Sequence, residues 1–312
     1  MSRPTALELP ANVVSRRLET ARGAFAVLDG APAKGSPHRG NVLLVPGFTG
    51  SKEDFLDLMP PVTAAGYRAV AVDGRGQYES PGPRDEKAYA QAELAADVRA
   101  QAVALATEYG AGAPLHLLGH SLGGQIARAA VLGEHPERRA AYASLTLMSS
   151  GPAAIEAQQQ VRTQLVIDHL PTMDMETAWH AMRSMDAEVA ADGGGDVEGG
   201  APAWLEDFLH RRWIGTRPEQ LIATARQLMS EKDRVAELAA LPLPKLVVSG
   251  EEDYAWPVPW LDEMAVRLGA RRVVIKDAGH SPNAEQPAET AAALIAFWND
   301  AEGRHEDSLT GK

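Results

Sequence analysis

Short apolar segments alternate with longer helical patterns along most of this 312-residue chain, and this alternation limits the possible folds more than any other feature. Near-continuous apolar segments indicate strands of a sheet that is covered on both faces. They span residues 41–46, 68–73, 114–119, 142–149, 245–250 and 271–276. The helical patterns span residues 88–109, 122–132, 258–268 and 287–299. We therefore predict an α/β fold with a mostly parallel sheet and helices on both faces, and an antiparallel hairpin of residues 12–19 and 23–28 at its edge.

One region interrupts this alternation. Residues 151–241 show helical patterns without a convincing strand, and we interpret them as a helical cap. Residues 1–150 and 242–300 then form the core. Within the cap, residues 193–200 are rich in glycine, which loses much entropy on ordering, so we expect a hinge or lid edge there. The polar residues 301–312 are expected to form a flexible tail.

Composition excludes several classes of protein. The chain has 30 Lys and Arg against 42 Asp and Glu, and a net charge of −12 argues against nucleic acid or anionic membranes as partners. Without cysteine there are no disulfides, thiolate metal sites or cysteine nucleophiles. No apolar run approaches the roughly 18 residues of a membrane span, and residues 1–5 lack the apolar core of a signal peptide. We expect a cytoplasmic protein with a small-molecule substrate, and a homodimer is compatible with the sequence.

A serine between glycines gives the sharpest chemical signal. Residues 119–124 read GHSLGG and stand between a predicted strand and a predicted helix. A direct turn from strand to helix forces Ser121 into a strained backbone conformation and exposes it at the carboxyl end of the strand. The alternative is a glycine-rich turn in which Ser121 is an ordinary helix N-cap. The neighbouring His120 is expected to point away from the site.

A serine hydroxyl needs a base to become a nucleophile, and His280 is placed to supply one. It follows the last predicted strand, where α/β sheets carry their chemistry, although a surface-loop histidine is the alternative. The acid that orients it is expected after the preceding strand, where Glu251, Glu252 and Asp253 follow one another. We choose Asp253, because it lies deeper in the loop than Glu252. Asp277 is a competitor, but it stands too close to His280 in sequence to reach it.

Ser121, Asp253 and His280 follow one another in the order and placement of the α/β-hydrolase fold. Over residues 12–300 the chain resembles the α/β-hydrolase superfamily, through the segments LLVPGFTGS, AVDGRGQYES, LLGHSLGG, VVSGEEDYAWP and DAGHSPNAEQP. The resemblance implies a mostly parallel eight-stranded sheet and puts the family's cap domain at the insertion. It is specific for the superfamily and not for a substrate.

An oxyanion hole is expected beside the serine. The backbone amide of Leu122, directly after the nucleophile, is one predicted donor. By resemblance the second donor is the amide of Phe48, although Pro46 replaces the family's histidine in that loop. The change leaves the backbone donor in place. The resemblance also gives Asp73 and Arg75 a structural role in fixing loops beneath the active site.

Tryptophan and methionine side chains gather in the cap, which indicates an adaptable apolar pocket. We expect Phe48, Trp179, Trp213 and Trp256 to contact the substrate. For each cap side chain, packing between helices is the alternative.

We interpret the chain as a serine hydrolase for a small to medium, fairly apolar carboxylic ester, thioester or lactone, without a metal or organic cofactor. Ser121 attacks the carbonyl, His280 transfers the proton and Asp253 orients His280. Hydrolysis of C–C bonds, acyl transfer and perhydrolysis use the same residues and stay open as alternatives. Dehalogenases and epoxide hydrolases of this fold need an Asp nucleophile, so Ser121 argues against both. Outside enzymes, the alternative is a receptor that binds a small ligand without turnover.

Overall fold

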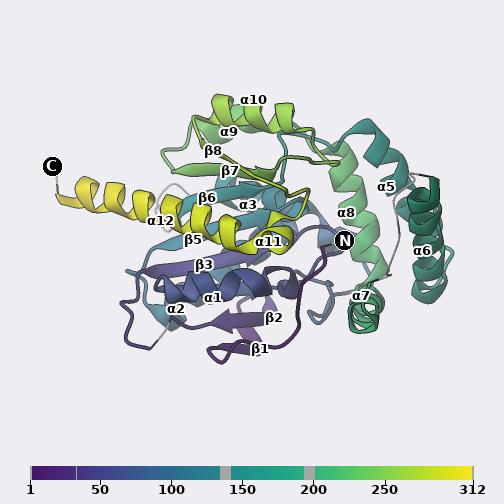
Figure 1. The fold of residues 1–312 in the computed structure, drawn as a ribbon, viewed down its shortest axis with the longest axis horizontal. Helices are drawn as coiled ribbons and strands as arrows, with labels where there is room; N and C mark the ends of the chain where they lie inside the picture. The colour runs from purple at the N-terminus through teal and green to yellow at the C-terminus, as the bar shows by residue number, and fades with distance from the viewer. Residues whose placement is uncertain (1, 33, 134–141, 193–200, 311–312) are drawn as a thin grey trace.

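The structure is a computed structural model that describes residues 2–32, 34–133, 142–192 and 201–310. Its eight strands form one sheet in the order β1-β2-β4-β3-β5-β6-β7-β8 (Figure 1). The strands are β1 (Val13–Thr20), β2 (Gly23–Gly30), β3 (Gly40–Val45), β4 (Tyr67–Val72), β5 (Leu115–His120), β6 (Tyr142–Met148), β7 (Lys245–Gly250) and β8 (Arg271–Ile275). β2 is antiparallel to β1 and β4, and all other pairs are parallel. The predicted α/β fold class is confirmed.

Two apolar layers explain why the central strands are apolar along their whole length. Every residue of β3, β5 and β7 is buried, because helices cover both faces of the sheet. On one face α2, α3 and α10 pack against the strands, and on the other α1 and α12 do so (Figure 1). The core helices are η1 (Lys52–Leu58), α1 (Met59–Ala64), η2 (Glu86–Tyr89), α2 (Gln91–Tyr109), α3 (Leu122–Leu132), α10 (Val258–Leu268), α11 (Pro282–Glu285) and α12 (Pro287–Thr310).

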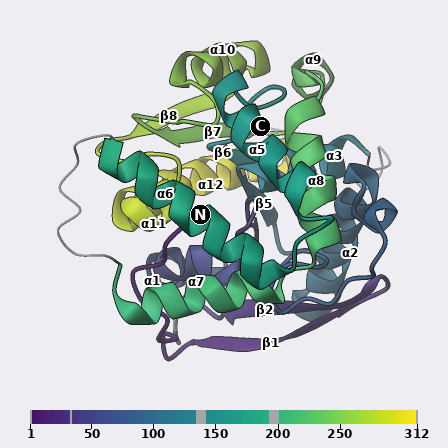
Figure 2. The same ribbon diagram turned by 90° about the vertical axis from the view of Figure 1, so that its right-hand side faces the viewer.

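Between residues 151 and 241 the described residues contain helices and no strand. These helices are α5 (Ala157–His169), α6 (Met175–Asp192), α7 (Ala203–Gly215), α8 (Pro218–Ser230) and α9 (Val235–Ala239). Helices α5 to α8 gather at one end of the sheet, opposite the end from which α12 extends (Figures 1 and 2). The glycine-rich stretch at residues 193–200, expected to be a hinge, lies outside the described residues.

The C-terminal region differs from the expected flexible tail. Helix α12 continues to Thr310, well past residue 301, and Ala301 is buried. Glu302 reaches the buried His116 of β5, with 3.2 Å between Oε1 and Nε2, so this part of the helix is packed against the core. Of the described helices, none is both long and apolar enough to cross a membrane.

Candidate active site

Ser121 stands in a sharp turn between β5 and α3, with φ 55° and ψ −121°. The left-handed φ is the strained conformation that the strand–turn–helix pattern predicts. Glycines make the turn possible: a Cβ on Gly119 would lie 2.2 Å from the carbonyl oxygen of Gly123. A Cβ on Gly123 would lie 2.3 Å from the carbonyl oxygen of Val45. The close approach of β3, β5 and α3 therefore holds the serine in place.

The structure brings Ser121, His280 and Asp253 together from three separate loops. Oγ of Ser121 lies 3.0 Å from Nε2 of His280, and Nδ1 of His280 lies 2.9 Å from Oδ1 of Asp253. A carboxylate only accepts hydrogen bonds, so Nδ1 of His280 carries the proton and Nε2 presents its lone pair to the serine hydroxyl. All three side chains are buried or nearly so. This geometry lets the imidazole accept the serine proton.

Asp253 is held by its own loop. Oδ1 also accepts hydrogen bonds from the amides of Ala255 and Trp256, at 2.8 and 3.0 Å. The competitor Asp277 is exposed, and its amide donates to Glu251 at 2.9 Å. Of the acids considered from the sequence, Asp253 is thus the one that lies against His280.

The loop after β3 supplies donors beside the serine. A Cβ on Gly47 would lie 3.0 Å from Cβ of Ser121, so this loop touches the nucleophile. Among the described residues, neither the amide of Phe48 nor that of Leu122 has a hydrogen-bond acceptor. The loop is anchored by Gln77, whose Nε2 donates to the Gly47 carbonyl at 3.0 Å. Both amides are therefore free to donate a hydrogen bond to a further acceptor.

Buried charges beneath the site hold the loops that carry it. Lys52 and Asp73 form an ion pair with 3.0 Å between Nζ and Oδ2. Burial acts to lower the pKa of Lys52, but Asp73 and Glu53 outweigh it and raise that pKa, so the ammonium stays charged. Arg75 forms a separate ion pair with Asp97 of α2, with 2.5 Å between Nη2 and Oδ1. These contacts fit the structural role that the resemblance implied for Asp73 and Arg75.

His120 does not point away from the site as expected. Its Nε2 donates to the carbonyl oxygen of His280 at 2.8 Å, and it lines the cavity beside Ser121. Complete burial, together with the nearby His280, lowers the pKa of His120 to about 3. The ring is therefore neutral near pH 7 and ties the His280 loop to the serine turn.

A cavity of about 220 Å³ lies over Ser121, between the strand ends and the cap. Its lining mixes apolar and polar side chains, and many of the polar ones had no signal in the sequence. The lining residues are Ser2, Gly47, Phe48, Thr49, Asp54, His120, Ser121, Ile155, Gln159, Thr163, Met182, Leu228, Tyr254, Ala255 and His280. Gln159 and Thr163 stand four residues apart on α5 and therefore share one face of the helix. This spacing is visible in the sequence and could have indicated a polar face directed toward the site.

The three tryptophans expected to contact the substrate do not line this cavity. Trp179 and Trp213 are buried in the cap cluster, which consists of Leu170, Trp179, Leu205, Phe208, Leu209, Trp213, Leu221 and Ile222. Trp256 is fully buried in the core, and its Nε1 donates to the Ala153 carbonyl at 2.9 Å. The large rings stabilise the packing of the cap helices and of the segment that joins them to the core, because burying an aromatic ring removes a large apolar surface from water. Phe48 does line the cavity, as expected.

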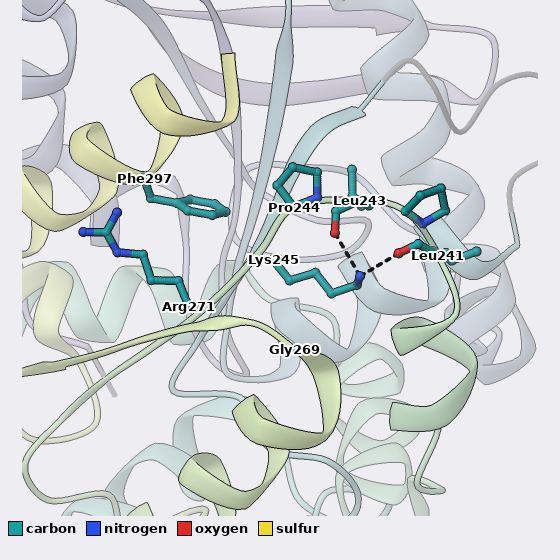
Figure 3. Close-up of a pocket in the computed structure, with 8 residues that line it drawn as sticks. Leu241, Leu243, Pro244, Lys245, Gly269, Arg271 and Phe297 are labelled. Atoms are coloured by element: carbon teal, nitrogen blue, oxygen red, sulfur yellow. Dashed lines mark hydrogen bonds between the residues drawn. The ribbon is translucent and has the colours of Figure 1, made fainter. Parts of the chain in front are cut away.

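A larger cavity, of about 360 Å³, lies where β7 and β8 begin, at the opposite ends of these strands from Asp253 and His280 (Figure 3). Its lining contains one buried charged side chain, Lys245, whose Nζ donates to the carbonyls of Leu241 and Leu243 at 2.7 and 2.9 Å. Arg271 points away from it and pairs with Asp300 (Figure 3). No group of three or more potential ligands for a metal ion occurs in the described part of the chain.

Comparisons with known proteins agree with this geometry. The model of the alpha/beta hydrolase family matches residues 42–293. Epoxide hydrolase B of Mycobacterium tuberculosis (strain ATCC 25618 / H37Rv) is 33% identical over 141 residues, which cover 45% of this chain and 37% of that protein. The chain thus aligns with little more than a third of that relative. Epoxide hydrolase A of the same strain is 26% identical over 307 residues, covering 86% of this chain and 94% of that protein.

A solved structure of an esterase from Exiguobacterium antarcticum superposes with a TM-score of 0.70 at 18% identity, over 92% of this chain and 100% of the esterase. At that identity the likeness shows the fold. Together with the family match, the fold and the strained serine turn define the class: this chain belongs to the alpha/beta hydrolase family.

Proposed function

We propose that this hydrolase cleaves a small carboxylic ester, thioester or lactone through an acyl-enzyme on Ser121. The hydrogen-bonded series Ser121 Oγ, His280 Nε2 and Nδ1, Asp253 Oδ1 carries the proposal, at 3.0 and 2.9 Å. His280 takes the serine proton as Oγ attacks the carbonyl carbon, and the amides of Phe48 and Leu122 stabilise the oxyanion. The protonated His280 gives its proton to the leaving alcohol or thiol. Water, activated by the same ring, then releases the acid.

The epoxide hydrolase relatives do not transfer their activity to this site. Opening an epoxide with the hydroxyl of Ser121 would form an ether, and a general base with water does not hydrolyse an ether at a useful rate. Attack on an acyl carbon instead forms an ester on Ser121, which the same base and water cleave. The nucleophile therefore favours acyl chemistry.

The cavity narrows the substrate class. Its volume of about 220 Å³ lies below the roughly 300–1,000 Å³ of most ligand pockets, which favours a small substrate. Phe48 and Met182 offer apolar contact, whereas Gln159 and Thr163 offer hydrogen bonds. We infer a small acyl compound with one polar substituent, rather than a fully apolar one.

A fluorophosphonate probe tests the proposal. It should modify the protein once, at Ser121, and Ser121→Ala should abolish both labelling and hydrolysis of p-nitrophenyl acetate. Ser230→Ala, an exposed serine on α8, is the matched control and should leave both unchanged. His280→Ala should also abolish hydrolysis, which separates an enzyme from a receptor. Ester turnover that persists in Ser121→Ala would overturn the assignment.

A further inference from the structure

The first residues of the chain lie against the active site, although they are far from it in sequence. Ser2 and Pro4 are buried while Arg3 and Thr5 are exposed. This alternation is typical of an extended chain with one face on the protein. We call residues 2–9 the N-terminal strap. It passes from β1 along the end of the sheet that faces the cap helices (Figures 1 and 2).

Ser2 is fixed at the cavity from two sides. Its Oγ lies 2.8 Å from Oγ of Ser281, the neighbour of His280. Its carbonyl oxygen accepts a hydrogen bond from Nη2 of Arg212 at 3.0 Å. Arg212 belongs to α7 of the cap, is fully buried and donates from Nη1 to Asp54 of the core at 2.6 Å. One buried guanidinium thus joins cap, core and strap, and withdrawing Ser2 would leave a charged donor without its acceptor.

The following residues keep the strap in register. The amide and hydroxyl of Thr5 donate to the carboxylate of Asp57, at 3.1 and 2.9 Å. Leu7 packs against the cap cluster. The strap is therefore held at three successive points and presents Ser2 to the cavity in a defined position.

We propose that the strap determines substrate size: Ser2 forms a wall of the cavity over Ser121 and excludes esters with long acyl chains. Ser2 lines the cavity together with Phe48 and Tyr254, and the cavity is smaller than most ligand pockets. The proposal rests on the proposed ester hydrolysis. The strap is proposed to limit the size of the cavity over Ser121, and it takes no part in the chemical steps.

Three variants test the strap. Deleting residues 2–4 should raise the kcat/KM ratio for p-nitrophenyl octanoate over acetate at least tenfold, because the wall is removed. Ser2→Trp should lower the ratio for butyrate over acetate at least tenfold, because the indole fills the cavity. Arg3→Trp is the matched control: the same side chain on the exposed face of the strap should leave both ratios within twofold.

The outcomes separate the two proposals. If Ser121→Ala retains turnover, the proposed function fails. If Ser121 is required, but the deletion and Ser2→Trp leave both ratios within twofold, the strap proposal fails. The rates at which short-chain and long-chain fluorophosphonates label Ser121 provide a second comparison of the same variants. This measurement does not depend on ester turnover. Should the deletion impair folding, Ser2→Trp still decides, since it keeps the backbone carbonyl that Arg212 binds.

Discussion

Replacing Arg212 by methionine removes the buried cation that joins the cap to the core. Arg212 is fully buried and Asp54 is 1% exposed, with 2.6 Å between Nη1 and Oδ1. Methionine keeps an unbranched apolar side chain but has no charge and no donor. Asp54 then retains the amide of Ser51 at 3.2 Å as a hydrogen-bond donor. The variant therefore leaves a buried carboxylate without its counter-charge.

The size of the effect follows from the geometry. At 2.6 Å and an effective dielectric constant of about 20, two unit charges attract by about 6 kcal/mol. Removing one partner of a buried pair costs about 3–5 kcal/mol of unfolding free energy. Burial raises the pKa of Asp54 and Arg212 lowers it, so Arg212→Met raises it further. A folded pKa above the unfolded value means that stability is lost as pH rises, so the deficit of the variant should be larger at pH 7.5 than at pH 5.

Urea unfolding followed by tryptophan fluorescence measures this deficit at both pH values. The double variant Asp54→Asn, Arg212→Met should recover at least half of the loss, because no charge remains to be buried. Arg226→Met breaks an exposed ion pair with Glu86 and serves as the control, with an expected loss below about 1 kcal/mol. A loss for Arg212→Met as small as for Arg226→Met, or one that does not depend on pH, would show that Arg212 is not the counter-charge that stabilises buried Asp54.

Three further predictions concern the site itself. Gly47→Ala places a Cβ 3.0 Å from Cβ of Ser121 and should lower kcat roughly 100-fold, because the loop after β3 has to shift. The control Gly112→Ala, whose Cβ would have no atom within 4 Å, should leave kcat unchanged. Steady-state kinetics measure both values, and equal kcat values for the two variants would show that the position of this loop does not matter for catalysis. Asp253→Asn should lower kcat about 10⁴-fold with an unchanged circular dichroism spectrum, and a loss under tenfold would show that the acid does not orient His280. His120→Gln should flatten the pH dependence of the free energy of unfolding, because unfolded His120 has its ordinary pKa of about 6.5 and folded His120 a pKa of about 3. As the pH falls from 6.5 to 3, the wild type should therefore lose up to about 1.4 kcal/mol of unfolding free energy per pH unit relative to the variant. Parallel stability curves for the two proteins in urea would contradict that assignment.

The parts of the fold that the sequence predicts are those with local signals. Fully apolar β3 and β5 mark strands inside a covered sheet, and the glycines around Ser121 mark a tight strand-to-helix turn. Asp253 follows β7 and His280 follows β8 of the same sheet, and parallel strands have their carboxyl ends on the same side. Local patterns combined with parallel topology therefore suffice to bring these three residues together.

The wall of the cavity could not be predicted, because its contacts join residues distant in sequence. The contact between Ser2 and Ser281 spans 279 positions, and nothing in the sequence around Ser2 indicates it. The cap tryptophans were misplaced for a related reason. Trp179 and Trp213 stand on amphipathic helices, and the pattern shows that one face is buried without showing what covers it. Helices of the cap bury those faces against one another instead of around a substrate.

The proposed hydrolysis requires that Ser121 becomes acylated during turnover, and mass spectrometry detects this acylation directly. The enzyme is mixed with p-nitrophenyl butyrate, quenched in acid during the first turnovers and digested. The peptide containing Ser121 should gain one butyryl group, and the gain should disappear in Ser121→Ala. Hydrolysis in wild-type protein without acylation of Ser121, or with the acyl group on another residue, would show that Ser121 is not the nucleophile.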